Sequence, residues 1–411
     1  MPPDWPRTRK NGMRKSLAFL AFSAALAAPA SADAQNTIKI GDLNSYALMS
    51  ISTTHYKRGA DLAIEQINAV GGVLGRKLEI VTRDDGGNPG EAVRAAEGLV
   101  SSDKVDMLTG TILSNVGLAV TDFAKHRKIF FLASAPLTDK IIYQDGNRYT
   151  FRLRASTYSH AAALVPLAAN SSKRWALVYP NFEYGQSATE SFKRLLKQAQ
   201  PDVQFVTEQA VPLGKVDAGA VAQAVDDAKP DAIFNVLFGS DLAKLVREGE
   251  TRGVFKGREV VSLLTGEPEY MDPLRSDAPV NWLVTGYPWY AIQTPEHKAF
   301  LDAYQKKFND YPRIASLVGY DAFKAIAAGI AKAGNTDSEK LADAFKGLTF
   351  DSPTGKVTFR AQDHQSTFGL YVGRTDVKDG KGYMKSFEYI DGSKLQPSDA
   401  EVKQWRPAQA N

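Results

Sequence analysis

Residues 60–85 read ADLAIEQINAVGGVLGRKLEIVTRDD, and the order of signals in this stretch decides the fold class. Apolar residues recur with the i, i+3, i+4, i+7 spacing of an amphipathic helix, at Ala60, Ala63, Ile64 and Ile67. Gly71-Gly72 ends this helix, because glycine accepts the left-handed conformation that helix ends need. Residues 77–83 then return as a strand. A helix that leads through a glycine turn into a strand is typical of an α/β protein.

Short strands and helices alternate on both sides of this stretch. Asn88-Pro89-Gly90-Glu91 has the order of a helix start, with Asn as the cap and Pro at the first helical position. We interpret Asp84-Asp85 before it as a strand end and a turn, with a metal-binding or acid–base pair as the alternative. Further strands are expected over residues 37–43, 105–109 and 128–133, and a helix near 115–125. This alternation predicts a parallel sheet with helices on both faces.

The pattern restarts after an extended segment at residues 151–154. Strands are expected over 175–179, 203–208, 232–237, 260–264 and 282–286, with helices near 183–198, 217–228 and 241–251. Later segments suggest helices near 296–308 and 317–333 and strands over 355–360, 369–374 and 384–390. The chain has 411 residues, more than one ordinary domain needs. We therefore expect two α/β lobes between which the chain crosses several times.

The composition is that of a globular protein, with 44% apolar and 23% charged residues. The sequence has no cysteine, which excludes disulfides, thiolate metal sites, cysteine nucleophiles and lipid attachment at a cysteine. The formal net charge is +4, but five basic and two acidic residues lie within 1–34, so the remainder carries only +1. A near-neutral body argues against a nucleic-acid partner, which favours a basic surface.

The N-terminal residues 1–34 have the order of a secretory signal peptide. A basic start precedes the apolar run 17–28 and the small residues 29–34, with cleavage expected after Ala32 or Ala34. Met1 and Met13 are both possible starts. The apolar run is shorter than the ~20 residues that span a bilayer, and we judge no later segment long and apolar enough. We therefore expect an exported protein of a Gram-negative periplasm, without membrane insertion.

The motifs of common catalytic sites are missing from the sequence. The five histidines form no pair with metal-ligand spacing, so we expect them in surface or capping roles. No G-x-S-x-G or G-x-x-x-x-G-K-[ST] motif occurs. The glycine-rich residues 71–75 follow a helix and not a strand, so they cannot aim a helix N-terminus at a phosphate and are interpreted as a turn. These features argue against an enzyme.

Several segments occur in an order that identifies a family. The most specific is residues 67–81 (INAVGGVLGRKLEIV) with Asp84-Asp85 and Pro89. Supporting matches are Ile38-Lys39-Ile40-Gly41, Gly59-Ala60, Tyr184-Gly185, Arg252-Gly253 and Gly319-Tyr320-Asp321-Ala322. Over essentially the whole mature chain, this order resembles the periplasmic leucine/isoleucine/valine-binding proteins, the substrate-binding proteins of branched-chain-type ABC transporters. The resemblance implies a type I binding protein that closes on a small ligand and delivers it to a membrane permease.

The resemblance also implies the domain organisation, namely two doubly wound parallel-sheet lobes joined by a multi-crossing hinge. We place the N-terminal lobe at residues 36–153 and 287–353 and the C-terminal lobe at 154–286 and 354–405, and we expect a monomer. Open α/β sheets bind ligands beyond the carboxyl ends of their strands, and clefts between domains are common ligand sites. The site residues are therefore sought at strand ends.

Two strand ends of the first lobe are expected to hold a ligand carboxylate. Ser114 opens a helix whose free N–H groups and dipole suit an anion. By resemblance it is the family's carboxylate-binding serine, and the alternative is a plain N-cap. Ser134 and Ala135 match positions at which the family contacts the same carboxylate. The family usually has threonine at the position of Pro136, so this donor is lost or moved to Thr138.

Three residues of the second lobe are further candidates for ligand contacts. Tyr184 matches an aromatic residue that contacts the ligand in the family, with packing as the alternative. Phe238 lies near a position where the family often has tyrosine. Glu267 either pairs with a ligand ammonium group, as in the amino-acid binders, or is a solvated loop residue. Inside a closed cleft it would need a cationic or hydrogen-bonding partner, because an unpaired buried carboxylate is costly.

Residues 44–50 differ most from the family, which usually has a small-residue loop with Gly-Pro there. Tyr46, Leu48 and Met49 are bulkier, and Tyr46 is included among the candidate ligand contacts. The aromatic residues of 287–290 either close over the ligand or pack the hinge, and we favour packing. A cleft rich in Tyr and Phe favours an aromatic or large apolar acid over a small amino acid.

The sequence therefore predicts a capture protein that needs no catalytic residue, cofactor or metal. Its ligand is a small carboxylate-bearing molecule, either an amino acid or an aromatic or apolar acid, and its partner is the permease of an ABC transporter. One alternative is a sensor of the same fold that signals to a receptor or regulator. Another is a periplasmic hydrolase, which would need an activated nucleophile or a carboxylate pair.

Overall fold

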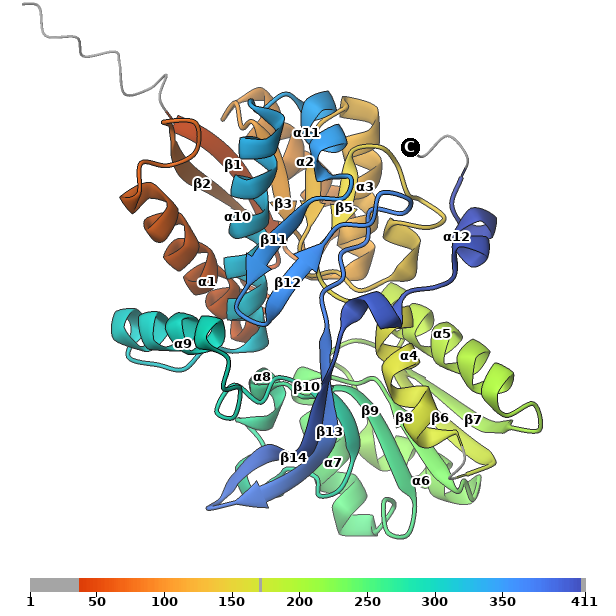
Figure 1. Ribbon diagram of the computed structural model, residues 1–411. Helices are drawn as coiled ribbons and strands as arrows, with labels where there is room; N and C mark the ends of the chain where they lie inside the picture. Colours follow the sequence, from red (N-terminus) through yellow and green to blue (C-terminus); the bar gives the residue numbers. More distant parts are fainter. Residues whose placement is uncertain (1–36, 170–171, 408–411) are drawn as a thin grey trace, which may run out of the picture. The chain divides into compact units, whose positions relative to one another are not determined.

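A computed structural model describes residues 37–169 and 172–407 of the chain (Figure 1). The strands form a five-stranded sheet of order β2-β1-β3-β4-β5, a seven-stranded sheet of order β14-β13-β10-β9-β8-β6-β7, and a small two-stranded sheet of β11 and β12. The predicted signal peptide, residues 1–34, lies outside the described residues.

The five-stranded sheet is parallel throughout and has a doubly wound strand order. Its strands are β1 (Thr37–Asn44), β2 (Lys77–Asp84), β3 (Met107–Gly110), β4 (Phe131–Ala133) and β5 (Thr150–Arg152). Successive side chains point to opposite faces: Met107 belongs to the core under α1 (Ser50–Ala69) and α10 (Ile314–Ala333), and Leu108 to the core under α2 (Pro89–Ser101) and α3 (Ser114–Arg127). Helices therefore cover both faces, as the sequence predicts.

The seven-stranded sheet differs from the expected parallel sheet at one edge. Its parallel strands are β6 (Arg174–Pro180), β7 (Gln204–Val211), β8 (Ala232–Asn235), β9 (Glu259–Gly266) and β10 (Leu283–Gly286). The edge strands β13 (Leu370–Lys378) and β14 (Lys381–Ile390) are antiparallel, because Asp379-Gly380 joins them in a tight turn that only antiparallel neighbours allow. Its helices are α4 (Thr157–Ala168), α5 (Glu183–Ala199), α6 (Ala218–Asp227), α7 (Gly239–Arg252) and α8 (Pro268–Met271).

The chain passes between the two large sheets three times. It leaves the first sheet after β5, returns after β10 to form α9 (Pro295–Phe308), α10 and α11 (Ser338–Phe345), and leaves again after the hairpin of β11 (Thr349–Ser352) and β12 (Gly355–Thr358). The chain then enters β13 and β14 and ends with α12 (Asp399–Trp405). These repeated crossings are those expected from the order of segments. The predicted residue boundaries of the two lobes remain a prediction.

The local signals around residues 71–91 are confirmed. Residues 71–75 form a turn in which Gly71, Gly72 and Gly75 have positive φ angles. Asn88 caps α2 by accepting the N–H groups of Gly90 and Glu91. Asp84 ends β2, and Asp85 accepts hydrogen bonds from the Ser45 hydroxyl and the Gly87 N–H in the following turn.

Helix α10 corrects one interpretation of the sequence. By length and composition alone, α10 could cross a membrane. From the sequence, no such segment is expected after the N-terminus. Most of this helix is buried, and it packs along α1 in the core. Its apolar character is therefore that of a core helix that contacts other elements on most of its sides.

Three of the five histidines are buried, in contrast to the expected surface or capping roles. Nδ1 of His160 lies 2.9 Å from the Thr285 hydroxyl, and Nε2 of His297 lies 2.6 Å from the Tyr287 hydroxyl. Nδ1 of His364 lies 3.0 Å from the carbonyl oxygen of Thr150. Burial lowers the pKa of all three, so they are neutral structural groups at neutral pH.

Candidate functional site

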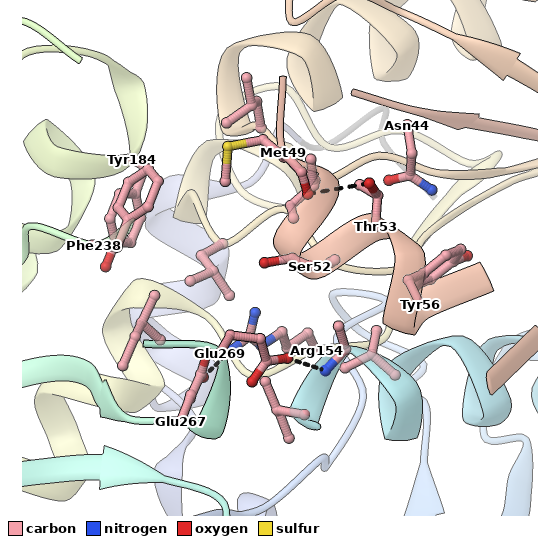
Figure 2. A pocket seen from close by; sticks show the side chains of 18 of the residues that line it. Asn44, Met49, Ser52, Thr53, Tyr56, Arg154, Tyr184, Phe238, Glu267 and Glu269 are labelled. Carbon is pink, nitrogen blue, oxygen red and sulfur yellow. Dashed lines mark hydrogen bonds and ion pairs between the residues drawn. The ribbon is translucent and has the colours of Figure 1, made fainter. Parts of the chain in front are cut away.

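A cavity that is partly open to solvent lies where strand ends and helix N-termini of both large sheets meet. Figure 2 shows Tyr184 and Phe238 on one side of this space, Ser52 and Thr53 opposite, and Arg154, Glu267 and Glu269 along its floor. The lining is completed by Asn44, Met49, Tyr56, Ile112, Leu113, Ser114, Ala135, Leu137, Phe182, Leu264, Tyr270, Ile314, Ala315 and Val318. Its position beyond the ends of β3, β4, β6, β8 and β9 is the one expected for a ligand site in open α/β sheets.

Ser114 is the first residue of α3 and lines the cavity. Leu113 is the N-cap, and no side chain caps this helix, so the plain N-cap alternative for Ser114 is wrong. The Ser114 hydroxyl oxygen accepts the N–H groups of Leu137 and Thr138 at 3.3 and 3.2 Å. Ser114 therefore joins the start of α3 to the segment after β4, while the first N–H groups of the helix have no partner within it.

The segment after β4 contributes less to the cavity than expected. Ala135 lines the space, but Ser134 is fully buried and is not among the lining residues. Pro136 packs beside Gly117 of α3. Thr138 does not take over the missing threonine donor, because its hydroxyl donates to a Glu183 carboxylate oxygen at 2.6 Å. The donor that the family usually has at Pro136 is therefore lost here.

Aromatic side chains form one wall of the cavity. The Tyr184 and Phe238 rings meet edge to face with centroids 5.7 Å apart, and Phe182 lies 6.0 Å from Tyr184. The Tyr270 ring lies 6.1 Å from Phe238. Phe182 and Phe238 are the N-caps of α5 and α7, so these rings project from the helix starts that follow β6 and β8. The buried Tyr184 hydroxyl has no hydrogen-bond partner among the described residues.

Glu267 is buried in the cavity floor, and its partner is Arg154. Nη2 of Arg154 donates to Oε1 of Glu267, and both side chains line the cavity. Burial raises the pKa of Glu267, and the guanidinium of Arg154 opposes that rise. The solvated-loop interpretation of Glu267 is therefore wrong, and the cationic partner that its burial requires comes from the protein itself.

Glu269 lies two residues further and is buried as well. Its Oε1 accepts the N–H of Ala315, in the first turn of α10, at 2.8 Å, and its Oε2 has no partner among the described residues. Burial and the neighbouring charge of Glu267 raise the pKa of Glu269 to about 8. This rise favours the protonated form of Glu269.

Tyr46 is outside the cavity lining, although its loop is close to it. Its hydroxyl donates to Oδ2 of the buried Asp42 at 2.5 Å. Met49, from the same loop, does line the cavity. At residues 287–290 the packing interpretation is confirmed for Tyr287, which is buried, and for Trp289, whose ring stacks on Tyr311 with centroids 4.4 Å apart, whereas Tyr290 is exposed.

Comparison with known proteins agrees with this architecture. A family model described as periplasmic binding protein matches residues 37–381. The chain belongs to the periplasmic binding protein family. A leucine-, isoleucine-, valine-, threonine- and alanine-binding protein of Pseudomonas aeruginosa is 28% identical over 334 residues, which cover 78% of this chain and 87% of that protein. A Leu/Ile/Val-binding protein homolog of Brucella suis is 26% identical, covering 83% of this chain and 88% of the relative.

Solved structures give the same fold. A solute-binding protein of an ABC transporter from Rhodopseudomonas palustris, solved with 4-hydroxybenzoate, has a TM-score of 0.78 at 24% identity and covers 90% of this chain and 100% of that structure. A leucine-binding protein of Thermotoga maritima has a TM-score of 0.74 at 21% identity, with 85% and 98% covered. Together with the family model and the curated relatives, this likeness supports a periplasmic binding protein of the branched-chain amino acid type.

Several cavity residues of this binding protein were missed at the sequence level. Arg154 follows strand β5, so the strand-end rule that selected Ser114 applies to it equally. Glu269 stands two residues beyond the selected Glu267. Ser52 and Thr53 begin α1, and Ala315 begins α10. Nothing in the local sequence indicates that these residues line the cavity. They reach it only because α1 packs against α10.

Proposed function

We propose that this protein captures a small carboxylate-bearing ligand, an amino acid or an aromatic or apolar acid, between its two lobes and delivers it to an ABC transporter permease. The observation that carries the proposal is the convergence of side chains from both large sheets on one cavity. Ser114 and Ala135 come from elements that follow the first sheet's strands, and Tyr184, Phe238 and Glu267 from elements that follow the second sheet's strands. A ligand that contacts both sets favours their approach, because it binds the closed arrangement more tightly than the open one.

The chemistry of the lining supports an acid with an apolar body. The start of α3 offers N–H groups and the positive end of a helix dipole, which suit a carboxylate. The rings of Phe182, Tyr184 and Phe238 offer apolar and π surface to the rest of the ligand. In this proposal the protein binds its ligand without altering it, and it is secreted to the periplasm and acts as a monomer.

The proposal is tested by measuring affinity with the purified protein. A panel of amino acids, aromatic acids and short-chain acids is screened by thermal shift, since ligands that bind only the folded state raise its melting temperature. Hits are titrated by calorimetry against the wild type and Tyr184→Ala. We expect the substitution to weaken binding by about tenfold or more, which corresponds to about 1.4 kcal/mol or more of lost contact.

The matched control is Tyr389→Ala, which removes an exposed ring of β14 that does not line the cavity. Its affinity should equal that of the wild type. A panel without any binder, or equal affinities of wild type and Tyr184→Ala, would contradict the proposal. Delivery is tested separately by uptake of a labelled hit into cells with and without the gene, where equal uptake would favour a sensor over a transport protein.

A further inference from the structure

The charged groups of the cavity leave no free anion for a ligand cation. Arg154, Glu267 and Glu269 are the Asp, Glu, Lys, Arg and His side chains among the described residues that line it. The Glu267 carboxylate is bonded to Arg154, and Glu269 accepts the Ala315 N–H, while burial and the charge of Glu267 raise the pKa of Glu269 and favour its neutral form. The charged pair on this floor is therefore neutralised internally, and among the described lining residues no carboxylate without a counter-charge remains for a ligand cation.

The same floor presents hydrogen-bond donors. Arg154 has five N–H donors and no acceptor, and its side chain makes a hydrogen bond only to Glu267 among the described residues. A protonated Glu269 adds one O–H donor, and its Oε2 is the atom without a partner. An ammonium group also has donors only, and the carboxylate oxygens that could accept from it belong to Glu267, whose charge Arg154 already offsets, so it finds no unpaired counter-charge on this floor. A hydroxyl oxygen of a ligand can accept from the same groups.

We propose that the cavity takes carboxylic acids that carry a hydrogen or a hydroxyl group where an α-amino acid carries its ammonium group. This inference rests on the proposed capture of a small acid and names its chemical class. The hydroxyls of Ser52 and Tyr184, which have no partners among the described residues, could accept a hydrogen bond from an ammonium group. Because they are neutral, they cannot offset its charge in a buried site.

The test uses sets of acids that differ only in the group at the α carbon. Phenylalanine, phenyllactate and 3-phenylpropionate form one set. Leucine, 2-hydroxy-4-methylpentanoate and 4-methylpentanoate form a second, and alanine, lactate and propionate a third. Calorimetric affinities for the wild-type protein should favour the deaminated or hydroxy acid by about tenfold or more in whichever set binds.

Two variants move the preference in opposite directions. Arg154→Met leaves the Glu267 carboxylate without its counter-charge, so it should shift the ratio of affinities towards the amino acid. Glu267→Gln leaves the Arg154 guanidinium without its counter-charge and should shift the ratio further towards the deaminated acid. The second variant keeps the test decisive if the first does not fold. Arg374→Met is the matched control, because Arg374 pairs with Glu259 at 3.0 Å outside the cavity lining.

The possible outcomes separate this inference, the role of the Arg154–Glu267 pair and the proposed function. Equal or tighter binding of the amino acid in its set would overturn this inference and leave the proposed function standing. A ratio that neither variant changes would overturn the role given to the Arg154–Glu267 pair. Binding of none of the acids, amino acids included, would contradict the proposed function and this inference together.

Discussion

Asp42, at the end of β1, is a buried carboxyl group close to the cavity. Its Oδ1 accepts a hydrogen bond from the Asn44 side chain at 3.0 Å, and its Oδ2 accepts one from Tyr46. Burial raises the pKa of Asp42 to about 7, and these two hydrogen bonds and the charge of Lys57 lower it only in part. Because an unfolded aspartate ionises near pH 4, the folded chain keeps a proton that the unfolded chain loses.

This difference predicts how stability depends on pH. Between about pH 4 and 7 the folded state binds more protons than the unfolded state at Asp42, so its contribution to the free energy of unfolding falls as pH rises, by at most about 1.4 kcal/mol per pH unit. Above pH 7 the contribution is constant. Urea denaturation of wild type and Asp42→Asn should therefore give stabilities whose difference changes from pH 4 to 7 and is level from pH 8 to 9. Parallel curves over the whole range would show that Asp42 ionises normally.

At the scale of elements, α1 and α10 depend on two glycines for their close packing. A Cβ at Gly59 would lie 1.9 Å from the carbonyl oxygen of Ser316, and one at Gly319 would lie 2.1 Å from that of Tyr56. The two helix backbones therefore touch where both helices approach the cavity. Tyr56 and Ala315, on either side of this contact, line the cavity.

Gly59→Ala should separate these helices. We expect the free energy of unfolding to fall by roughly 3 kcal/mol, the upper range for overpacking, because rigid helix backbone must move. Gly98→Ala in α2 is the control, since a Cβ there meets nothing within 4 Å and alanine favours a helix by about 0.5–1 kcal/mol. Both stabilities are measured by urea denaturation. A Gly59→Ala protein as stable as wild type would contradict the close contact.

At the scale of the whole molecule, the cavity is lined from both large sheets, and the chain passes between the sheets three times. Under the proposed function, ligand contacts on both sides draw the lobes together by a hinge motion. The three crossing segments are the places where such a motion changes the backbone.

Small-angle X-ray scattering tests this closure. The radius of gyration of the wild type should decrease when a ligand from the screen is added at saturation. The radius of gyration of Tyr184→Ala should decrease less at the same ligand concentration, because the weaker-binding variant is only partly occupied there. Tyr389→Ala should behave like the wild type. A radius of gyration that stays constant while calorimetry shows full occupancy would contradict hinge closure upon binding.

The alternation of strands and helices, the glycine turn at residues 71–75 and the cap at Asn88 could be predicted because they depend on neighbouring residues. The same holds for the family, which rests on the order of such segments. The antiparallel edge formed by β13 and β14 was missed, since the direction of a strand depends on its partner in the sheet. Helix α4 was also not predicted, because its apolar residues lie on most of its sides and do not show the spacing of an amphipathic helix.

In the candidate site, too, some features could be predicted from the sequence and others depend on the tertiary structure. Strand ends, together with the family resemblance, pointed to Ser114, Ala135, Tyr184, Phe238 and Glu267, and these five line one cavity, although their contact with a ligand remains a prediction. Ser134 and Tyr46 were expected at the cavity but are not among its lining residues. Only the tertiary structure paired Glu267 with Arg154, 113 residues away, because the energy of a buried charge depends on which groups the fold brings beside it. The sequence by itself determined the fold class and the family, and packing over long distances decided which charged groups line the cavity and how they are paired.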